Sequence, residues 1–426
     1  MTKGRLISLL TFLLVLTACE RDGLELTLNV GPYGEETRRV LLLYEAGYNS
    51  LSSSFAANIS TLKEGYLPGK GRNDDVLLVF SHLTSSVQNY VKPTEPVLLR
   101  FYESSGMVMV DTLKTWPAGK PIADAAIVRE VFEWVREAFP AAGYGAVFSS
   151  HSTGWLPAGY LADPTPYEGN DRTPGGNVWS APRMQTFGQE YYEAGKKIKE
   201  IELKDFAAAI PYRLDYILFD ACLMGTVEVA WALRDVCSQV AFSPCEIPAA
   251  GIDYRTLTEC LLGQETPDLK GVCEDYYLRY KDDGTYGAAI TMVDCSALDV
   301  LADACRPLFE RYRMEIRTLE GKNVQVYDRR AGSKFYYIFF DLKDMLREAG
   351  ATEEELAGLQ RAMDEVIVYE AHTPKFLSVD LSRASGLATY LPARPEYKKD
   401  YWHGTEFLDG FYKENIAWNQ ATSFVE

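Results

Sequence analysis

The stretch Tyr216-Ile-Leu-Phe-Asp-Ala-Cys-Leu-Met224 is an apolar run that ends on an aspartate and a cysteine. A second run, Ala146-Val-Phe-Ser-Ser150, leads directly into His151. Runs without polar alternation are typical of strands buried on both faces of a parallel sheet. Reacting groups in such sheets collect beyond the carboxyl ends of the strands. The two runs therefore predict a sheet edge that presents both the thiol of Cys222 and the imidazole of His151.

The rest of the chain alternates strand-like and helix-like segments. Residues 39–44 and 75–81 are further apolar runs, whereas residues 123–139 repeat apolar side chains at helical spacing. Residues 96–110 read as a hairpin at a sheet edge. This alternation predicts an α/β fold with a mostly parallel sheet, helices on both faces and right-handed crossovers. The other elements expected are helices at residues 189–199, 206–210, 227–236, 254–262 and 298–319, and strands at 239–243, 287–293 and 386–391.

A chain of 426 residues is longer than one hydrophobic core usually serves, so two packed units are expected. We divide it into a signal peptide (1–18), a tether (19–37), an α/β domain (38–255) and a smaller C-terminal α+β half (256–426). The α/β domain carries both candidate residues. The polar segment at residues 156–182 is expected to be an exposed loop beside them.

The first residues have the composition of an export signal. Lys3 and Arg5 precede an apolar run at residues 6–16, which is too short to cross a bilayer as a helix. The run ends in Leu16-Thr-Ala-Cys19, which resembles a bacterial lipobox and implies cleavage before Cys19 and lipidation of that residue. Glu20-Arg-Asp22 resembles the acidic tags of surface lipoproteins in Bacteroidetes. We expect a membrane-anchored lipoprotein of the bacterial cell envelope, periplasmic or on the cell surface. The alternative is an ordinary secretory signal with an incidental cysteine.

Net charge and cysteine content limit the classes of partner and metal that we expect the chain to bind. A formal net charge of −17 repels nucleic acid and weakly favours basic peptides. The eight cysteines include no CxxC pair and no spacing with histidine that suits zinc. If Cys19 carries lipid, an odd number remains, which leaves at least one thiol unpaired. The others either pair as disulfides or stay buried as free thiols. We expect a monomer with no metal, no other cofactor and no nucleic acid.

Cys222 and His151 suit nucleophilic attack on an amide. A helix beginning at residue 224 would place its free amides near the thiol and lower the thiol pKa. His151 would take the thiol proton, or hold the pair as thiolate and imidazolium, and then protonate the leaving amine. The expected oxyanion donors are the backbone N–H groups of Cys222 and of Ser152 or Thr153. The alternative is that a strand-end cysteine and a buried histidine are both structural.

Both stretches resemble motifs of the clostripain family of cysteine peptidases, which has a caspase-like fold. Ser150-His151 followed by Gly154-Trp155 is similar to the family's SHxxGW stretch, and residues 220–228 are similar to its DxCxMGxxE stretch. The likeness extends over residues 38–420. It implies an endopeptidase with a His151 and Cys222 dyad that cuts protein or peptide substrates after Arg or Lys, read by acidic groups in the pocket.

Asp220 matches one of those acids. Family members often carry a second acid where this chain has Ala249 and Ala250, so Glu246 and Asp253 are the nearby candidates for substrate binding. Family members can also cut themselves between the histidine and the cysteine to become active, and some need calcium, for which the chain has no recognisable loop. Possible cut sites are Arg172, Arg183, Lys196, Lys197 and Lys199.

Two other functions are compatible with parts of the sequence. A surface lipoprotein with a caspase-like body would bind peptide or glycan without turnover; the joint presence of His151, Cys222 and Asp220 argues against it. An α/β esterase would need a G-x-S-x-G elbow, which the chain lacks.

Ser152 occupies the position where the family often has glycine, which leaves the backbone of the oxyanion loop less free to change conformation.

Overall fold

The computed structural model describes residues 37–70, 74–82, 94–158, 187–192, 197–328, 337–392 and 405–426. Within it, Glu35–Glu426 form one compact unit. The expected signal peptide, Cys19 and nearly all of the tether lie outside the described residues, as does most of the loop expected at 156–182. Among the residues that are described, no helix is long and apolar enough to cross a membrane.

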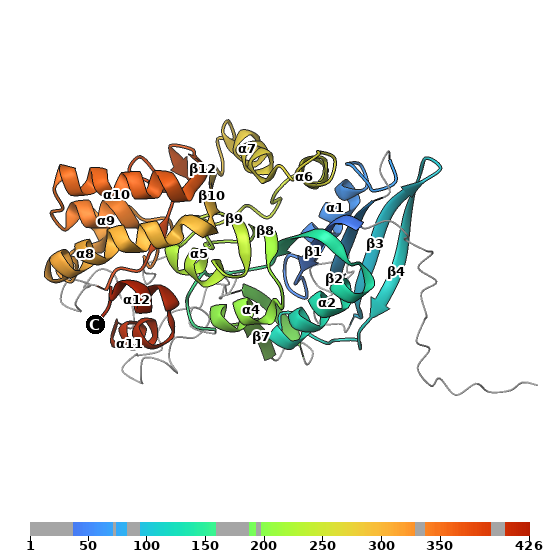
Figure 1. Ribbon diagram of the computed structural model, residues 1–426, viewed down its shortest axis with the longest axis horizontal. Coiled ribbons are helices and arrows are strands. Elements are labelled where there is room, and N and C mark those ends of the chain that lie inside the picture. Colours follow the sequence, from blue (N-terminus) through green and yellow to red (C-terminus); the bar gives the residue numbers. More distant parts are fainter. Residues whose placement is uncertain are drawn as a thin grey trace, which may run out of the picture. The chain divides into compact units, whose positions relative to one another are not determined.

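A nine-stranded sheet forms the centre of the unit, in the order β12-β10-β9-β8-β5-β1-β2-β3-β4 (Figure 1). Strands β2, β1, β5, β8 and β9 are parallel, whereas β3, β4, β10 and β12 pair in antiparallel fashion. The expected mostly parallel α/β sheet and its edge hairpin are confirmed. The bounds are β1 Thr37–Glu45, β2 Asp75–His82, β3 Pro96–Ser104, β4 Met107–Thr115, β5 Ala141–Ser149, β8 Leu214–Asp220, β9 Cys237–Phe242, β10 Ala289–Asp294 and β12 Ile367–His372.

Helices cover both faces of this sheet, which is why the middle of its central strands is apolar on both faces. On one face, α1 (Ser52–Leu62), α6 (Tyr254–Leu261) and α7 (Leu269–Tyr280) pack on alternate strand residues such as Leu41 and Leu43. On the other face, Phe132 of α2 (Ala125–Ala138) and Phe206 of α4 (Leu203–Ala209) pack against Phe148 of β5. The two sets of helices lie above and below the strands in Figure 1.

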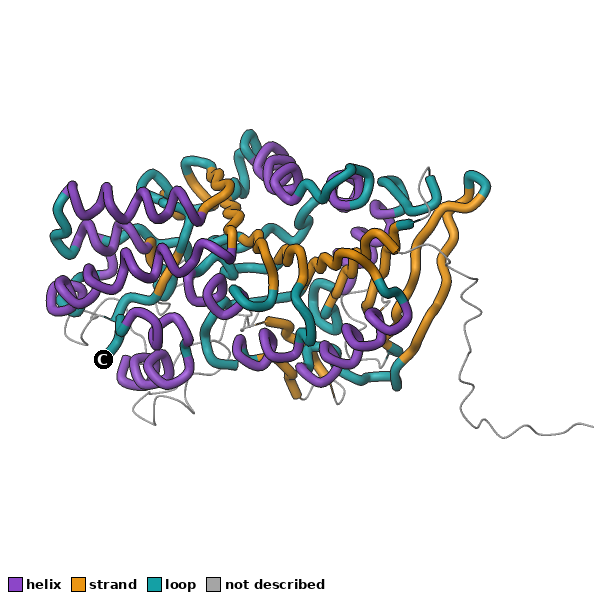
Figure 2. Tube along the Cα trace, in the orientation of Figure 1, coloured by secondary structure: helices purple, strands orange, loops and turns teal. Residues whose placement is uncertain are grey.

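The C-terminal half shares the central sheet, because β10 and β12 extend it beyond β9. Its helices α8, α9 and α10 pack against one another at one end of the sheet (Figure 2). One sheet runs through both parts of the chain, and the division expected near residue 255 stays a prediction. The remaining elements are α5 Val227–Leu233, α8 Leu298–Ile316, α9 Leu342–Glu348, α10 Glu353–Val366, α11 Thr405–Asn415, α12 Ala417–Thr422, β11 Phe340–Asp341, β13 Lys375–Phe376, β14 Val379–Asp380, β15 Ala388–Thr389, and 3₁₀ helices Cys295–Ala297 and Gly321–Asn323.

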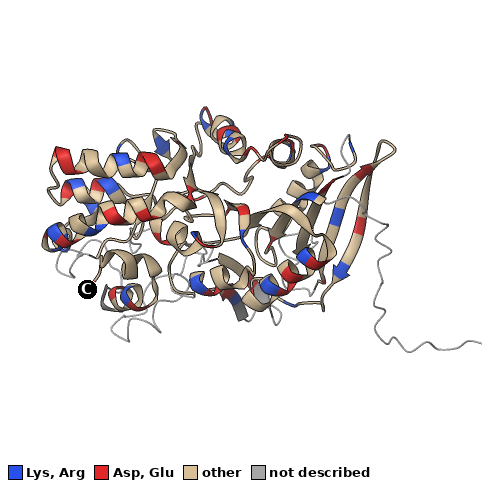
Figure 3. Ribbon diagram, viewed as in Figure 1, with Lys and Arg blue, Asp and Glu red and all other residues tan. Residues whose placement is uncertain are grey.

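Charged residues of both signs occur along the helices α2, α8 and α10 (Figure 3). In α10 the first turn carries Glu353, Glu354 and Glu355, and Thr352 and Glu355 form a capping box. Acidic groups at a helix N-terminus are stabilising because they face free amides and the positive end of the helix dipole. Part of the net negative charge of the chain therefore lies at the N-terminus of α10, where it stabilises the helix.

The helix expected at residues 189–199 is wrong. The chain forms an antiparallel pair there, β6 (Phe187–Tyr192) with β7 (Lys197–Ile201). Gly188 has a φ of 78°, which does not fit a right-handed helix. The buried carboxylate of Glu190 accepts hydrogen bonds from distant backbone amides, those of Tyr48, Ile122 and Ala123. These long-range bonds hold the segment extended against its local helical pattern.

Candidate active site

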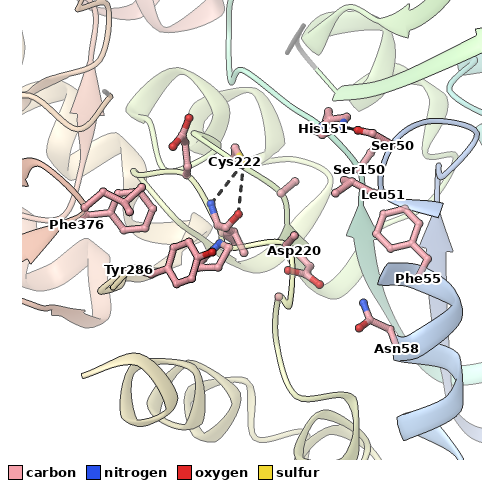
Figure 4. A pocket seen from close by; sticks show the side chains of 17 residues that line it. Ser50, Leu51, Phe55, Asn58, Ser150, His151, Asp220, Cys222, Tyr286 and Phe376 are labelled. Carbon is pink, nitrogen blue, oxygen red and sulfur yellow. Dashed lines mark hydrogen bonds between the residues drawn. The ribbon is translucent and has the colours of Figure 1, made fainter. Parts of the chain in front are cut away.

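The two catalytic candidates follow neighbouring parallel strands in register. Ser149, the last residue of β5, pairs with Asp220, the last residue of β8. His151 and Cys222 each come two residues later, so both side chains leave the sheet at the same edge. Both line one cavity of about 420 Å³ (Figure 4). The structure thus brings the predicted pair into one site.

The Cys222 thiol is half-buried and contacts the backbone of Ile247. The Ile247 N–H points to Sγ at 3.4 Å, and the Ile247 carbonyl oxygen lies 3.8 Å from Sγ. An N–H group directed at sulfur favours the thiolate. The expectation that a helix beginning at residue 224 would supply this amide is wrong, because α5 begins at Val227 and its N-terminus is capped by the Thr226 hydroxyl. The amide comes from the segment after β9.

The backbone just after Cys222 is strained. Leu223 has a φ of 58°, in the left-handed region that side chains other than glycine and asparagine rarely adopt. Its N–H donates to the carbonyl of Cys245 at 2.9 Å, and the N–H of Gly225 donates to Ser243 at 2.8 Å. Strain of this kind costs roughly 1–3 kcal/mol and persists where surrounding bonds impose it. Here it directs the cysteine loop across the end of β9.

The His151 imidazole is buried, with 5% of its surface exposed. Its Nε2 lies 2.9 Å from the hydroxyl of Ser50, and the two side chains are adjacent in Figure 4. Burial lowers the pKa of His151 to about 4, so the ring is neutral at pH 7. A neutral imidazole accepts a proton, which suits a general base better than a permanent imidazolium.

The loop after the histidine is tied to the cysteine loop. The Ser152 hydroxyl donates to the carbonyl oxygen of Cys222 at 2.5 Å, and the Gly188 N–H donates to the carbonyl of His151 at 3.0 Å. The Asn49 amide group donates to the carbonyls of Ala46 and Gln189. The serine that replaces the glycine common in such loops therefore has a structural partner. Oxyanion donation by the Ser152 and Cys222 amides stays a prediction.

Asp220 reaches the cavity with 8% of its surface exposed. Burial raises the pKa of Asp220 to about 6. Hydrogen bonds from the Tyr254 hydroxyl and the Ile252 amide, and the positive charge of Arg279, partly offset this rise. The Tyr254 hydroxyl donates to Oδ2 at 3.1 Å. Gly251 packs on this carboxylate with a φ of 57°, and a Cβ there would lie 2.6 Å from Oδ2. An acid of this kind, mostly ionised at pH 7, suits a cationic ligand group.

The other two predicted acids have different positions. Glu246 lines the cavity with Asp220. Asp253 lies outside that lining: it caps α6 and forms ion pairs with Arg255 at 2.9 Å and Arg279 at 3.1 Å. The Arg255 hydrogen bonds are the main cause that lowers the pKa of Asp253. The structure therefore does not support Asp253 as a substrate-binding residue.

Sequence reasoning missed the walls of the cavity. They come from segments far apart in the chain, namely Ser50, Leu51, Phe55 and Asn58 near α1, Tyr286 before β10, and Phe376 and Leu377 at β13. Figure 4 shows the α1 side chains on one side of Asp220 and Tyr286 on the other. No local pattern marks these residues, because each is an ordinary apolar or small polar side chain.

The family model for the clostripain family matches residues 43–423, which is most of the chain. The chain belongs to the clostripain family. It is accordingly a cysteine protease, and its mixed α/β architecture is that of C11 proteases. A comparison with curated protein sequences found no match.

Solved structures of clostripain-family (C11) proteases have the same fold. An inactive zymogen from Parabacteroides distasonis has a TM-score of 0.71 and 23% identity, covering 91% of this chain and 99% of its own. A secreted protease from Bacteroides thetaiotaomicron, in complex with an irreversible peptide inhibitor, has a TM-score of 0.69 and 23% identity, covering 92% and 100%. At this identity the likeness is one of fold.

The clostripain-type motif residues around His151 and Cys222 have packing roles here. Trp155 is fully buried and makes edge contacts with Tyr390 and Tyr412 at 5.1 Å between ring centroids. A Cβ on Gly154, whose φ is 62°, would lie 2.6 Å from the carbonyl oxygen of Leu223. Glu228 is buried, and its Oε1 accepts hydrogen bonds from the Thr389 hydroxyl, the Tyr390 amide and the Tyr412 hydroxyl. These residues hold the two loops and the C-terminal segment together.

No group of three or more His, Cys, Asp or Glu side chains is arranged to hold a metal ion within the described part of the chain. The possible cut sites Arg172, Arg183 and Lys196 lie outside the described residues. Lys197 and Lys199 lie on β7, and the Lys199 ammonium pairs with Asp124 at 3.1 Å.

Proposed function

We propose that this protease is an endopeptidase that cuts its substrates through Cys222 and His151, on the carboxyl side of Arg or Lys. The observation that supports it is the common cavity: thiol, imidazole and the Asp220 carboxylate line one space at the carboxyl edge of β5 and β8. A peptide carbonyl next to Cys222 would place the preceding side chain beside Asp220.

The chemistry follows from the protonation of the two groups. The neutral His151 takes the proton of the Cys222 thiol as sulfur attacks the carbonyl carbon, and the carbonyl oxygen becomes an oxyanion. The amides of Cys222 and Ser152 are the proposed donors to that oxygen. When the oxyanion collapses, the C–N bond breaks and the imidazolium gives its proton to the departing amine. The product of this half-reaction is a thioester on Cys222.

Hydrolysis of the thioester uses the same two residues. His151 takes a proton from water as the water oxygen bonds to the acyl carbon. The C–S bond then breaks, the new carboxylic acid leaves, and the imidazolium returns its proton to sulfur. Both residues end in the state in which they began, with one water consumed for each bond cut.

Two further properties belong to the proposal. Selection of Arg or Lys rests on Asp220, because a cation in the half-dry cavity satisfies a carboxylate that burial otherwise disfavours. The protein is a lipoprotein of the cell envelope, anchored through Cys19; this rests on the short apolar run that ends in Leu16-Thr-Ala-Cys19.

The test uses peptides that differ only in the residue before the reporter group: Arg, Lys, the neutral arginine analogue citrulline, and norleucine. We expect the wild-type chain to favour Arg and Lys, and Cys222→Ala and His151→Ala each to abolish turnover while thermal unfolding stays near wild type. Cys260→Ala is the matched control because Cys260 is also half-buried but lies on α6, away from the cavity lining. Undiminished hydrolysis by folded Cys222→Ala protein would overturn the mechanism.

A further inference from the structure

Four polar side chains form a row across the sheet beneath the cavity. Glu45 of β1 pairs in register with Ser81 of β2 and with Ser149 of β5, and Ser149 pairs with Asp220 of β8. Side chains at equivalent positions of parallel strands point to the same face. The four groups therefore lie side by side at the carboxyl edge of the sheet, on the face covered by α1 and α6. Asp220 is the member of the row that reaches the cavity.

Glu45 is a buried acid, and within the described part of the chain no positive charge acts on it. None of its surface is exposed, and neither carboxyl oxygen has a hydrogen-bond partner of normal geometry. The facing Ser81 hydroxyl is close enough to favour the ionised form but makes no well-formed bond with Glu45. Burial raises the pKa of Glu45 well above its usual value, and the charge of Asp220 raises it further. A carboxyl in this state lowers the stability of the fold, so its presence calls for a functional explanation.

Glu45 and Asp220 are coupled through their shared surroundings. The Ser149 hydroxyl lies 2.8 Å from the Tyr254 hydroxyl, which donates to Asp220 at 3.1 Å. The charges of both acids raise the pKa of Tyr254, so the tyrosine lies near both. The one cation acting on Asp220 among the described residues is Arg279, which is already paired with Asp253. The row is therefore rich in carboxyl groups and poor in positive charge.

We propose that Glu45, buried two strands from Asp220, is a second specificity-determining acid whose charge adds to that of Asp220 in attracting the guanidinium or ammonium group of a basic substrate side chain. This rests on the proposed function. In the empty cavity Glu45 holds a proton, because burial and the charge of Asp220, which lies beyond Ser149 in the row, both disfavour its carboxylate. An entering cation allows both to ionise, so that proton leaves. Glu45 thereby supplies the second acid that Ala249 and Ala250 do not provide at the rim.

Few other groups in this part of the structure can titrate with the pair; the cavity lining adds Glu246 and His151, and burial lowers the pKa of His151 to about 4. Strands β2 and β5 contribute the uncharged Ser81 and Ser149. The facing titratable and charged groups from the helices are Tyr254 of α6 and Tyr276, Arg279 and Tyr280 of α7. Burial raises the pKa of each of these tyrosines, so they stay neutral near pH 6. The proton released there belongs to the carboxyl pair.

The first experiment replaces Glu45 with its neutral isostere, Glu45→Gln. We expect kcat/KM for Arg and Lys peptides to fall roughly tenfold or more, while citrulline and norleucine peptides keep their values within about twofold. Glu228→Gln, the same change at another buried glutamate that lies outside the cavity lining, should leave the relative values for the four substrates unchanged. An equal loss on every substrate, or no loss on any, would overturn the role of Glu45 and leave the Cys222 mechanism and the wild-type preference standing.

The second experiment does not depend on the folding of a Glu45 variant. Cys222→Ala protein that also carries Glu246→Gln, with Glu45 intact, is titrated with the Arg peptide and with the citrulline peptide at pH 7, by calorimetry in two buffers of different ionisation enthalpy. Asp220, with a pKa of about 6, would alone release roughly 0.1 proton at this pH; we expect several times that release with the Arg peptide and none with citrulline. Release no larger than that of Asp220 alone would refute the role of the Glu45 proton, whereas a wild-type enzyme without any preference for basic residues would refute the proposed specificity itself.

Discussion

Replacing Asp220 with asparagine is the sharpest test of how the pocket selects its substrate. The change removes the charge and keeps the shape, and an oxygen remains to accept the Tyr254 hydroxyl that now lies 3.1 Å from Oδ2. Helix capping is not at stake, because Thr226 caps α5. The loss should therefore fall on the substrate cation rather than on the fold.

The size of the effect follows from the burial of the pair. A hydrogen-bonded ion pair in a partly dry site, broken on one side, costs roughly 2–5 kcal/mol. At about 1.4 kcal/mol for each factor of ten, that is a loss between about 30-fold and several thousandfold in kcat/KM for Arg and Lys peptides. Citrulline has the same shape without the charge and should change by less than about fivefold, since only neutral hydrogen bonds are altered.

The same reasoning predicts a pH dependence in the wild-type enzyme. Burial raises the pKa of Asp220 to about 6, so the carboxylate gains a proton and loses its charge as the pH falls through that value. His151, with a pKa lowered to about 4, keeps its basic form over the same range. Between pH 7 and pH 5 the ratio of kcat/KM for Arg over citrulline should drop by about tenfold. In Asp220→Asn this ratio should lose most of that change.

Matched peptides and one control variant decide the question. Glu64→Gln removes an exposed acid that pairs with Arg255 outside the cavity lining, and it should leave the Arg to citrulline ratio unchanged. If Asp220→Asn lowers turnover of both peptides by the same factor, the carboxylate fixes the loop and does not read the substrate. A wild-type preference for acidic or neutral residues before the cut would refute the reasoning at its root.

Three further outcomes are expected. Glu228→Ala should lower the free energy of unfolding by roughly 3–6 kcal/mol, because it leaves three buried hydrogen-bond donors without an acceptor. Glu228→Gln keeps an acceptor oxygen and should cost less than half of that, as measured by chemical denaturation. Gly251→Ala places a Cβ 2.6 Å from Asp220 at a φ of 57°, so we expect it to reduce cleavage after Arg more than after norleucine and to lower Tm. The native protein should begin at Cys19 and carry lipid; an intact mass that shows the signal retained, or an unmodified Cys19, would contradict this.

Local sequence predicted the central elements well, because their causes are local. The apolar runs at residues 39–44, 75–81 and 216–220 lie in β1, β2 and β8, and the helical spacing at 123–139 matches α2. A run that is apolar on both faces has few stable alternatives to a buried strand. The strand-end positions of His151 and Cys222 follow from those runs alone.

Where sequence reasoning failed, the deciding interactions join residues far apart in the chain. Residues 189–199 have a pattern compatible with a helix, yet the amides of Tyr48, Ile122 and Ala123 donate hydrogen bonds to Glu190 and hold β6 extended. Asp253 lies close to the pocket in sequence, but Arg279 from the next helix pairs with it outside the cavity. Spacing along the chain carries no information about such partners.

The amino-acid sequence by itself determined the parallel sheet, the edge at which the reacting groups leave it, and the family to which the protease belongs. Only the tertiary structure decided what surrounds those groups: the Ile247 amide at the thiol, the Ser50 hydroxyl at the imidazole, and the row in which Glu45 lies two strands from Asp220. The physical reason is that apolar periodicity acts within a segment, whereas desolvation and hydrogen bonding depend on strand register and on which distant groups that register brings together.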